Sequence, residues 1–188
     1  MSSSHKLVRL FSAVVLLLGL AVPVMAQDVP KVDLSGGYNL LRFTDETLPG
    51  GWYADVAGNL SEMIGLVGQV DGNYKTFGFS GLSVDTKIHG FMGGVRVNSR
   101  RNAKAVPFGQ VLFGGVRTSG SSNLSGVLPF SVGESETDAA LQVGGGVNVM
   151  PAGNVGLRVG ADYIRMFTPD QGTNVFRFSA GVVLPFGK

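Results

Sequence analysis

The sequence predicts an all-β protein, an eight-stranded antiparallel up-and-down transmembrane β-barrel. Three observations predict this fold. Eight runs of about ten residues alternate between apolar and polar residues, turn-forming sequences separate the runs, and the two faces of the runs differ in polarity. Alternation with a period of two places successive side chains on opposite faces of a strand, so each run has one apolar face and one polar face.

The composition excludes several other classes of protein. The chain of 188 residues has no cysteine, which excludes a disulfide framework, a cysteine-ligated metal site and a lipoprotein anchor. Apolar residues make up 44% of the chain and the net charge is only +2, so the chain is not intrinsically disordered. Its 29 glycines, about twice the average share, have no period of three, which excludes collagen.

Residues 1–26 have the layout of a secretory signal peptide. Lys6 and Arg9 precede Leu10–Val22, an apolar run of 13 residues that is too short for a membrane-spanning helix of about 20 residues. The sequence therefore predicts a cleaved signal peptide at 1–26 and one barrel domain at 27–188. Without the signal peptide the acidic and basic residues are equal in number, at 13 each, so no charge excess points to a nucleic-acid partner.

The first four predicted strands share a regular alternation and end at turn sequences. They are Lys31–Phe43, Gly51–Leu60, Ile64–Phe77 and Ile88–Ser99. In the first strand, for example, Val32 and Leu34 lie on one face and Asp33 lies on the other. The sequence DETLPGG, the short stretch 61–63 and a loop at 78–87 follow the first three strands as turns.

The last four predicted strands are separated by the same kinds of turn. They are Val106–Thr118, Asp138–Met150, Val155–Tyr163 and Thr173–Phe186. The strand at 106–118 has an ambiguous phase, because Gln110 shares a face with Leu112, whereas Arg117 favours the opposite face as the polar one. A Ser- and Gly-rich loop is predicted at Ser119–Thr137 and a tight turn at Pro151–Asn154.

Two kinds of barrel fit eight such strands: a soluble lipocalin-like carrier with an apolar interior, and a membrane barrel with an apolar exterior. Eight strands enclose a lumen just wide enough for side chains, so the bulky aromatic and aliphatic residues of the apolar face do not all fit inside. The polar face is small and glycine-rich, which suits a crowded interior. In a membrane, the reverse orientation costs about 2–4 kcal/mol for each Arg or Lys near the midplane. The sequence therefore predicts the membrane barrel.

The charged residues of the polar face are the candidate site. They are four acids and five bases: Asp33, Asp55, Asp71, Lys75, Arg96, Arg117, Arg158, Asp162 and Arg177. Buried charges persist only when they are paired. The sequence thus predicts a lumenal ion-pair network that plugs the barrel, with a path for protons or solutes as the alternative interpretation.

Four aromatic residues near strand ends are candidates for girdles at the membrane interfaces: Trp52, Tyr74, Phe176 and Phe186. Ordinary sheet packing explains these residues equally well, since strands favour aromatic side chains. Both interpretations place them on the apolar face.

The C-terminal strand has the most specific pattern in the chain. Ser179, Gly181, Leu184 and Phe186 follow the spacing of the assembly signal of outer-membrane barrels, although two residues follow the last aromatic one. With the strand pattern at 106–115, this resembles the OmpA/OmpX-like small outer-membrane β-barrel superfamily, in its single-domain form without a peptidoglycan-binding domain. The resemblance implies the cell outer membrane of a Gram-negative bacterium as the location. It implies outer-membrane lipid, the barrel-assembly machinery and periplasmic chaperones as partners.

The chain lacks the residue patterns of known catalytic sites. Deacylase-type barrels use a His-x-Ser arrangement, but here the corresponding triplet is His89-Gly90-Phe91, without the serine nucleophile. No phosphate loop, dinucleotide-binding motif or metal-ligand spacing occurs. The acidic stretches 45–46 and 134–138 are interpreted as solvated loop charge, with contact to divalent ions as the alternative. We therefore expect no catalytic residues, cofactor or metal.

These features together predict a non-enzymatic integral outer-membrane barrel with a structural or surface-interaction role and a charge-plugged lumen. A porin-like conduit for small solutes and a soluble lipocalin-like periplasmic carrier are the alternatives. The loop at Ser119–Thr137 is the candidate contact for a surface partner, because function concentrates in long loops on rigid scaffolds.

Overall fold

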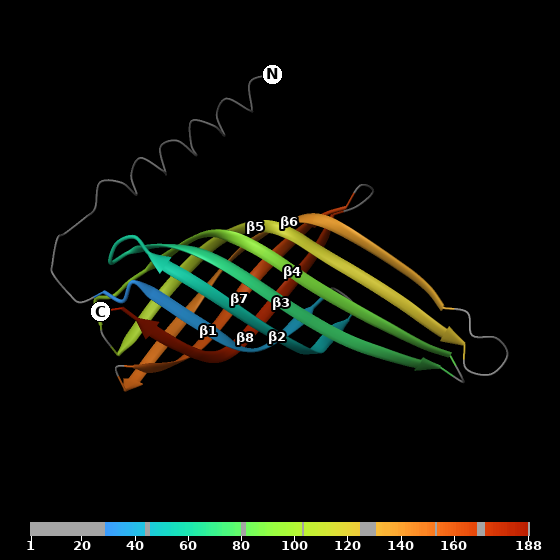
Figure 1. Cartoon of the computed structure of the whole chain (residues 1–188), viewed down its shortest axis with the longest axis horizontal. Coiled ribbons are helices and arrows are strands. Elements are labelled where there is room, and N and C mark those ends of the chain that lie inside the picture. The colour runs from blue at the N-terminus through green and yellow to red at the C-terminus, as the bar shows by residue number, and fades with distance from the viewer. Residues whose placement is uncertain are drawn as a thin grey trace, which may run out of the picture.

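The structure is a computed structural model that describes residues 29–43, 46–79, 82–102, 104–124, 131–152, 154–168 and 172–187. These residues form a closed β-barrel, shown from the side in Figure 1. The predicted signal peptide lies outside the described residues. In the described part of the chain, no helix is long and apolar enough to cross a membrane.

Eight strands follow one another around the barrel, each antiparallel to its neighbours. They are β1 (Val32–Arg42), β2 (Thr47–Asn59), β3 (Ile64–Phe79), β4 (Leu82–Asn98), β5 (Ala105–Leu124), β6 (Ser131–Ala152), β7 (Val155–Phe167) and β8 (Thr173–Phe186). β1 also pairs with β8, from Val32 opposite Phe186 to Arg42 opposite Phe176, and this pairing closes the barrel. Closure leaves no open backbone edge in the wall, as a lipid environment demands. The predicted fold is confirmed.

The two faces of the strands have opposite surroundings. On the outside, Phe91 is 58% exposed and Phe113 is 61% exposed. On the inside, Arg96 is 1% exposed and Arg177 is 2% exposed. A soluble carrier has the reverse arrangement, with its apolar side chains turned inward. The barrel therefore has the polarity that the sequence predicts for a membrane environment.

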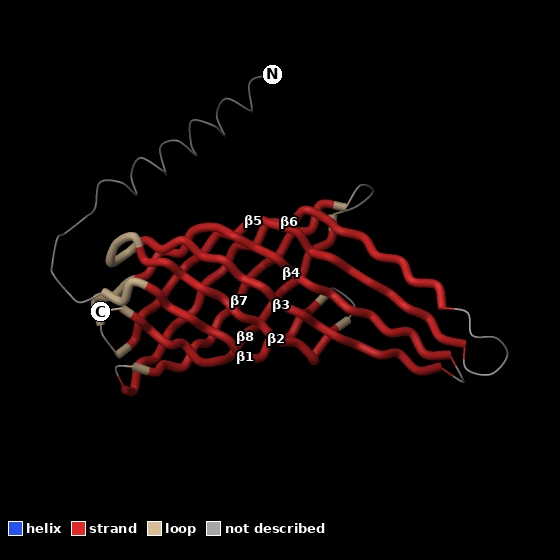
Figure 2. Tube along the Cα trace, viewed as in Figure 1, coloured by secondary structure: helices blue, strands red, loops and turns tan. Residues whose placement is uncertain are grey.

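Four strands continue past the others at one end of the barrel. There β3, β4, β5 and β6 form a four-stranded sheet that projects beyond the wall (Figures 1 and 2). We call this the loop end. The opposite end, where β1 begins and β8 ends, is the short-turn end, because β2–β3, β4–β5 and β6–β7 connect there through short turns.

The projecting sheet overturns two predicted loops. Phe79 pairs with Leu82 and Asn123 pairs with Ser131, so most of 78–87 and of Ser119–Thr137 is strand. These segments lack the apolar alternation that identifies strands in a sequence. They still extend the sheet because each backbone pairs with a neighbour that is already extended, and ladder hydrogen bonds need no apolar side chain.

The start of β2 also differs from the predicted turn DETLPGG. Asn39 of β1 pairs with Gly51, but Leu41 pairs with Leu48, so β2 carries one extra residue between these two pairs. Such a bulge shifts the alternation by one position. Leu48 consequently points inward and is 4% exposed.

Candidate functional site

The interior of the barrel holds a layer of paired charges, which we call the ionic layer. Its members are Asp55, Asp71, Arg96, Arg158, Asp162 and Arg177, from β2, β3, β4, β7 and β8. Alternation along each strand turns these side chains inward, and closure brings together residues that are far apart in the sequence. With three Arg and three Asp side chains, the layer has no net formal charge.

Asp55 binds two of the arginines. Its Oδ1 lies 3.1 Å from Nη1 of Arg96, and its Oδ2 lies 2.7 Å from Nη1 of Arg158. Arg158 also donates to the Asn148 side chain at 2.8 Å and to the Ser35 hydroxyl. The two guanidinium groups therefore share one carboxylate, and each is also held by neutral acceptors.

Arg177 binds the other two carboxylates. Its Nη2 lies 2.6 Å from Oδ2 of Asp162, and its Nη1 lies 3.3 Å from Oδ2 of Asp71. The same Nη2 donates to Oε1 of Gln69 at 2.9 Å. Arg177 thus links β3 to β7 across the lumen.

Glutamines join these ion pairs into one network. Gln110 accepts from Nε and Nη2 of Arg96, at 3.0 and 2.8 Å, and donates to Asp162 at 2.9 Å. Gln69 donates to Asp71 at 3.1 Å and to Gln142 at 3.3 Å. The amides satisfy oxygens and N–H groups that the ion pairs leave free, whereas Nη2 of Arg158 has no hydrogen-bond partner among the described residues.

An aromatic ring completes the ionic layer. Phe108 of β5 packs against two guanidinium groups, with its ring centroid 4.9 Å from Cζ of Arg96 and 4.9 Å from Cζ of Arg158. The ring face attracts both cations.

A second layer of the interior is apolar. It consists of Leu41, Leu48, Ile88, Met92, Leu112, Val116, Ala140, Ile164, Met166 and Val175, which belong to one buried cluster. On β4, β7 and β8 these residues lie nearer the loop end than Arg96, Asp162 and Arg177. A cavity beside this layer measures about 10 Å³, which is the volume of roughly one water molecule. We call this set the apolar layer, which was not among the features predicted from the sequence.

In a comparison with protein families, residues 12–186 match the family described as the outer membrane protein beta-barrel domain. This chain belongs to that family. No curated protein matches the chain. The family indicates the outer membrane of a Gram-negative bacterium as the location of the barrel, and its outward apolar face agrees with that environment. The soluble-carrier alternative is wrong for the same reasons.

Solved structures of outer-membrane proteins share the fold of this outer-membrane barrel. Neisserial surface protein A has a TM-score of 0.60 and 15% identity, covering 82% of this chain and 96% of its own. The attachment invasion locus protein Ail of Yersinia pestis has a TM-score of 0.52 and 15% identity, covering 81% and 96%. OprG of Pseudomonas aeruginosa has a TM-score of 0.53 and 9% identity, covering 88% and 100%. At these identities the likeness concerns the fold.

The structure places most of the predicted lumenal charges on the inner face of the outer-membrane barrel. These are Asp33, Asp55, Asp71, Lys75, Arg96, Arg158, Asp162 and Arg177. Two of them lie apart from the ionic layer. Asp33 pairs with Arg100 at 2.9 Å near the short-turn end, and Lys75 pairs with Glu46 at 2.6 Å near the loop end.

The predicted inward position of Arg117 is wrong. Arg117 lies exposed on the outer face of β5 and donates to Oγ of Ser135 at 3.2 Å, whereas Gln110, Leu112 and Val116 face inward. The prediction gave weight to charge alone, but β5 reaches the apolar layer at this height, where the inner face requires an aliphatic residue. On the outer face near the loop end, a charged side chain such as Arg117 is tolerated.

Neutral side chains that were not predicted as site residues also belong to the network. Gln69, Gln110 and Gln142 lie on the inner face and are at most 5% exposed. Their position on the polar face was the available signal, since Gln69 and Gln142 alternate with apolar residues. Asp138, which the sequence placed in a solvated acidic stretch, is also buried.

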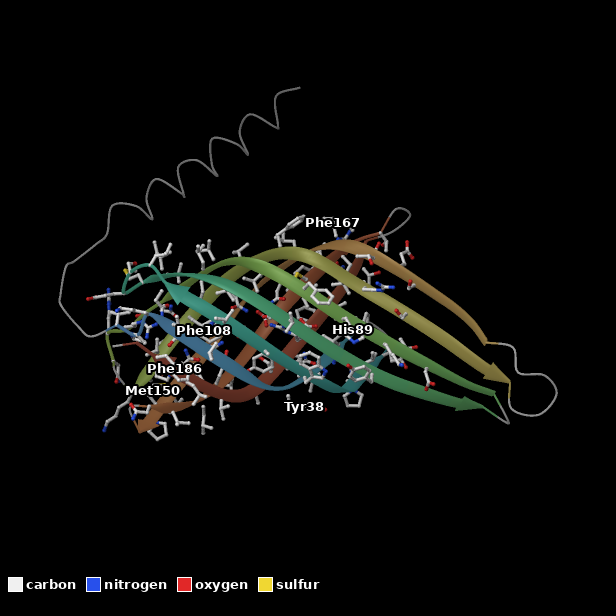
Figure 3. The ribbon with its side chains drawn as sticks, in the orientation of Figure 1. Tyr38, His89, Phe108, Met150, Phe167 and Phe186 are labelled. Atoms are coloured by element: carbon white, nitrogen blue, oxygen red, sulfur yellow. The ribbon has the colours of Figure 1, made fainter. Side chains whose placement is uncertain are left out.

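The C-terminal strand of the outer-membrane barrel lies at the closure between β8 and β1. Gly181 pairs with Gly37, and a Cβ on Gly181 would lie 2.3 Å from the carbonyl oxygen of Gly36. The strands approach too closely there for a larger residue. Phe186 is exposed on the outer face, at the short-turn end (Figure 3).

Aromatic side chains form a hydrogen-bonded row on the outer face near the loop end. Nε1 of Trp52 donates to the Tyr74 hydroxyl at 3.2 Å, and that hydroxyl lies 3.3 Å from Nε2 of His89. We call Trp52, Tyr74 and His89 the aromatic row. Among the described residues, no group of three or more His, Asp or Glu side chains converges as metal ligands do.

Proposed function

We propose that this protein is a non-enzymatic barrel of the outer membrane, exported by its N-terminal segment, which contributes to envelope structure or presents a surface at the cell exterior. The observation that carries this proposal is the filled interior. The ionic layer and the apolar layer together occupy the lumen. A barrel with such an interior is a rigid support for its ends and not an open pore.

Each layer opposes conduction for a different reason. A solute entering the ionic layer has to break ion pairs and leave buried charges without partners, which costs several kcal/mol for each pair. A hydrated ion entering the apolar layer has to lose its water to aliphatic side chains such as Leu112 and Ile164. The porin-like conduit therefore has less structural support than the closed barrel.

The projecting sheet of β3, β4, β5 and β6 is the proposed contact for a surface partner. It extends beyond the rest of the wall at the loop end (Figure 2). Because the sheet continues the barrel ladder, its position relative to the membrane is fixed by hydrogen bonds and not by a flexible loop. Outer-membrane lipid, the barrel-assembly machinery and periplasmic chaperones remain the other proposed partners, and no nucleic acid is among them.

The lack of a nucleophile beside the single described histidine supports a non-enzymatic role. The polar contact of His89 is the Tyr74 hydroxyl, which is a poor nucleophile unless a base removes its proton. The chain segment next to His89 supplies Gly90 and Phe91 and no serine.

Planar-bilayer recording of the purified, refolded barrel tests the closed interior. We expect no stable discrete conductance from the wild-type protein. The double variant Arg96→Ala with Leu112→Ala opens a gap in both layers and should give measurable conductance, which serves as the positive control for insertion. Steady discrete conductance from the wild-type barrel, at the level of the double variant, would contradict the proposal and support the conduit.

A further inference from the structure

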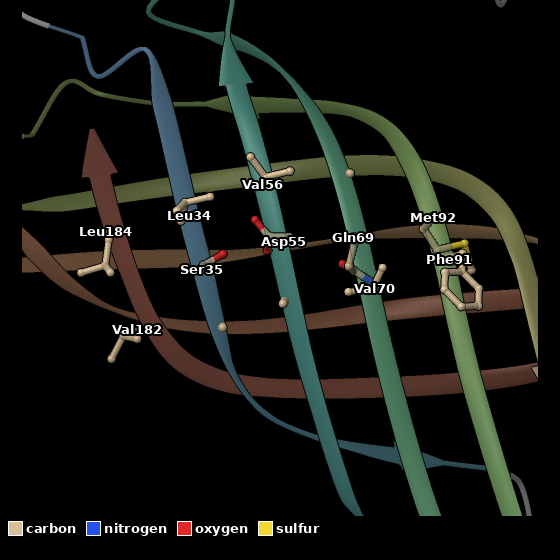
Figure 4. A pocket seen from close by; sticks show the side chains of 13 residues that line it. Leu34, Ser35, Asp55, Val56, Gln69, Val70, Phe91, Met92, Val182 and Leu184 are labelled. Carbon is tan, nitrogen blue, oxygen red and sulfur yellow. The ribbon is translucent and has the colours of Figure 1, made fainter. Parts of the chain in front are cut away.

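An apolar groove crosses the outer face of the barrel over β8, β1, β2, β3 and β4. Its volume is about 780 Å³, and large side chains such as Leu34, Val70 and Phe91 border it (Figure 4). Volumes of this size are typical of pockets that hold small organic ligands. The groove lies on the outward apolar face of the wall, which a membrane barrel turns toward lipid.

Small residues in adjacent strands form the floor of this groove. Gly36 pairs with Ala54, so two small residues stand next to one another across β1 and β2, and Gly68 of β3 lies beside Val56. Neighbouring side chains rise beside them and leave a depression. A smooth wall would contact any acyl chain of the bilayer equally well. The depression instead favours one acyl chain in a defined position.

The aromatic row borders the loop-end side of the groove. On β2, Trp52 comes two residues before Ala54, and on β4, His89 comes two residues before Phe91. Trp52 and Tyr74 are both 43% exposed, and the Tyr74 and His89 rings pack edge to face with centroids 5.6 Å apart. Rings with polar edges favour the boundary between hydrocarbon and headgroups. The row therefore marks the depth at which a lipid changes from acyl chain to headgroup.

Two cations follow on the same outer face, one step closer to the loop end. Lys87 is paired with Tyr74 across the β3–β4 ladder, and Arg117 is paired with His89 across the β4–β5 ladder. Both side chains are exposed. Asp85 lies on the same face of β4, two residues nearer the loop end, so Lys87 lies between this carboxylate and the aromatic row. Lys and Arg side chains at this depth attract anionic headgroups, and Arg binds phosphate oxygens in pairs.

Resting on the proposed function of a barrel embedded in the outer membrane, we propose that this face binds a phosphate-bearing anionic lipid of the surrounding leaflet. Its acyl chains lie in the groove, its polar linkage contacts the aromatic row, and its phosphate binds Lys87 and Arg117. On β4 alone, Phe91, His89 and Lys87 follow one another in the order of a lipid from its chains to its phosphate. This order on neighbouring strands is the observation that selects a lipid over a partner protein.

The single tryptophan of the chain, Trp52, lies in the proposed site and reports on it directly. The refolded barrel is placed in phosphatidylcholine vesicles that contain a small fraction of either brominated phosphatidylglycerol or brominated phosphatidylcholine. Bromine quenches Trp52 fluorescence only at contact distance. We expect the anionic lipid to have an apparent association constant about fivefold higher or more than the zwitterionic lipid, given two cations near the headgroup.

Paired variants separate this site from general charge attraction. The double variant Lys87→Gln with Arg117→Gln should bring the ratio of the two association constants close to one. Arg165→Gln is the matched control: Arg165 lies on β7 and donates to Asn174, so its loss changes the net charge at the loop end without touching the site. Ala54→Phe fills the groove and should reduce quenching by both lipids.

Three results would overturn the proposal. Equal quenching by both lipids in the wild type means that the headgroup is not recognised. An equal loss of selectivity in Arg165→Gln means that the attraction is general. Weak quenching that becomes stronger when the protein is diluted in lipid means that a second copy of the barrel covers the groove. Heat-modifiable mobility on a gel confirms that each variant is folded, and planar-bilayer conductance is independent of all three outcomes.

Discussion

At the scale of single residues, the barrel depends on how each buried charge is neutralised. Asp55 is the clearest case, because its two oxygens bind two guanidinium groups at 3.1 and 2.7 Å and its side chain is only 3% exposed. A buried charge that loses its partner costs more than the pair contributes when intact. The stability of the barrel is therefore more sensitive to Asp55 than to charges at the rim.

Replacing Asp55 with Asn should lower the free energy of unfolding by about 3–5 kcal/mol, because Arg96 and Arg158 would share no carboxylate. Glu46→Gln is the matched control: its ion pair with Lys75 is 2.6 Å long, but the Glu46 side chain is 41% exposed. Its loss should cost about 1 kcal/mol or less. Urea unfolding in lipid vesicles measures the free energy of unfolding of both variants. Equal losses of this free energy would contradict the importance of burial for the Asp55 ion pairs.

At the scale of strands, close approach between neighbours decides which positions tolerate a side chain. A Cβ on Gly114 of β5 would lie 1.9 Å from the carbonyl oxygen of Phe91 and 2.9 Å from Cα of Met92, both on β4. The contact is with backbone, which cannot rotate away. On the opposite face, a Cβ on Gly115 would lie 3.5 Å from its nearest neighbour, Cγ2 of Thr137.

Gly114→Ala should therefore destabilise the barrel by about 1–3 kcal/mol through overpacking between β4 and β5. Gly115→Ala, one residue away in the same strand, should be almost neutral. The fraction of protein that keeps heat-modifiable mobility after incubation in urea compares the two variants directly. Tolerance of alanine at both positions would show that β4 and β5 lie farther apart than the structure indicates.

At the scale of the whole molecule, the last strand closes the barrel against β1 and carries the predicted assembly signal. Phe186 lies at the short-turn end of β8, opposite Val32, and is 49% exposed. Phe176 lies on the same strand and the same face near the other end, and is 53% exposed. Comparing variants of these two residues therefore distinguishes a role in assembly from a role in general packing.

Phe186→Ala should reduce the amount of barrel in the outer membrane of cells several-fold, while the purified variant refolds in detergent as well as the wild type. Phe176→Ala loses a similar exposed ring and should assemble normally. Heat-modifiable mobility of membrane fractions and of refolded protein gives both measurements. Equal defects of the two variants in cells would mean that Phe186 has no part in recognition by the assembly machinery.

The sequence by itself determined the features that depend on local alternation. A period of two defines strands, and the difference between faces defines which side meets lipid, because both are properties of neighbouring residues. For this reason the inward positions of Asp55, Arg96, Arg158 and Arg177 follow from the sequence.

Only the tertiary structure decided the features that depend on residues across the barrel. Arg117 faces outward because the opposing wall at that height is apolar, and β3 to β6 continue past the predicted loops because their neighbours are extended. The same holds for the partners of each arginine and for the groove beside the aromatic row. Pairing and packing across a closed barrel join distant residues, and no local pattern records which residues those are.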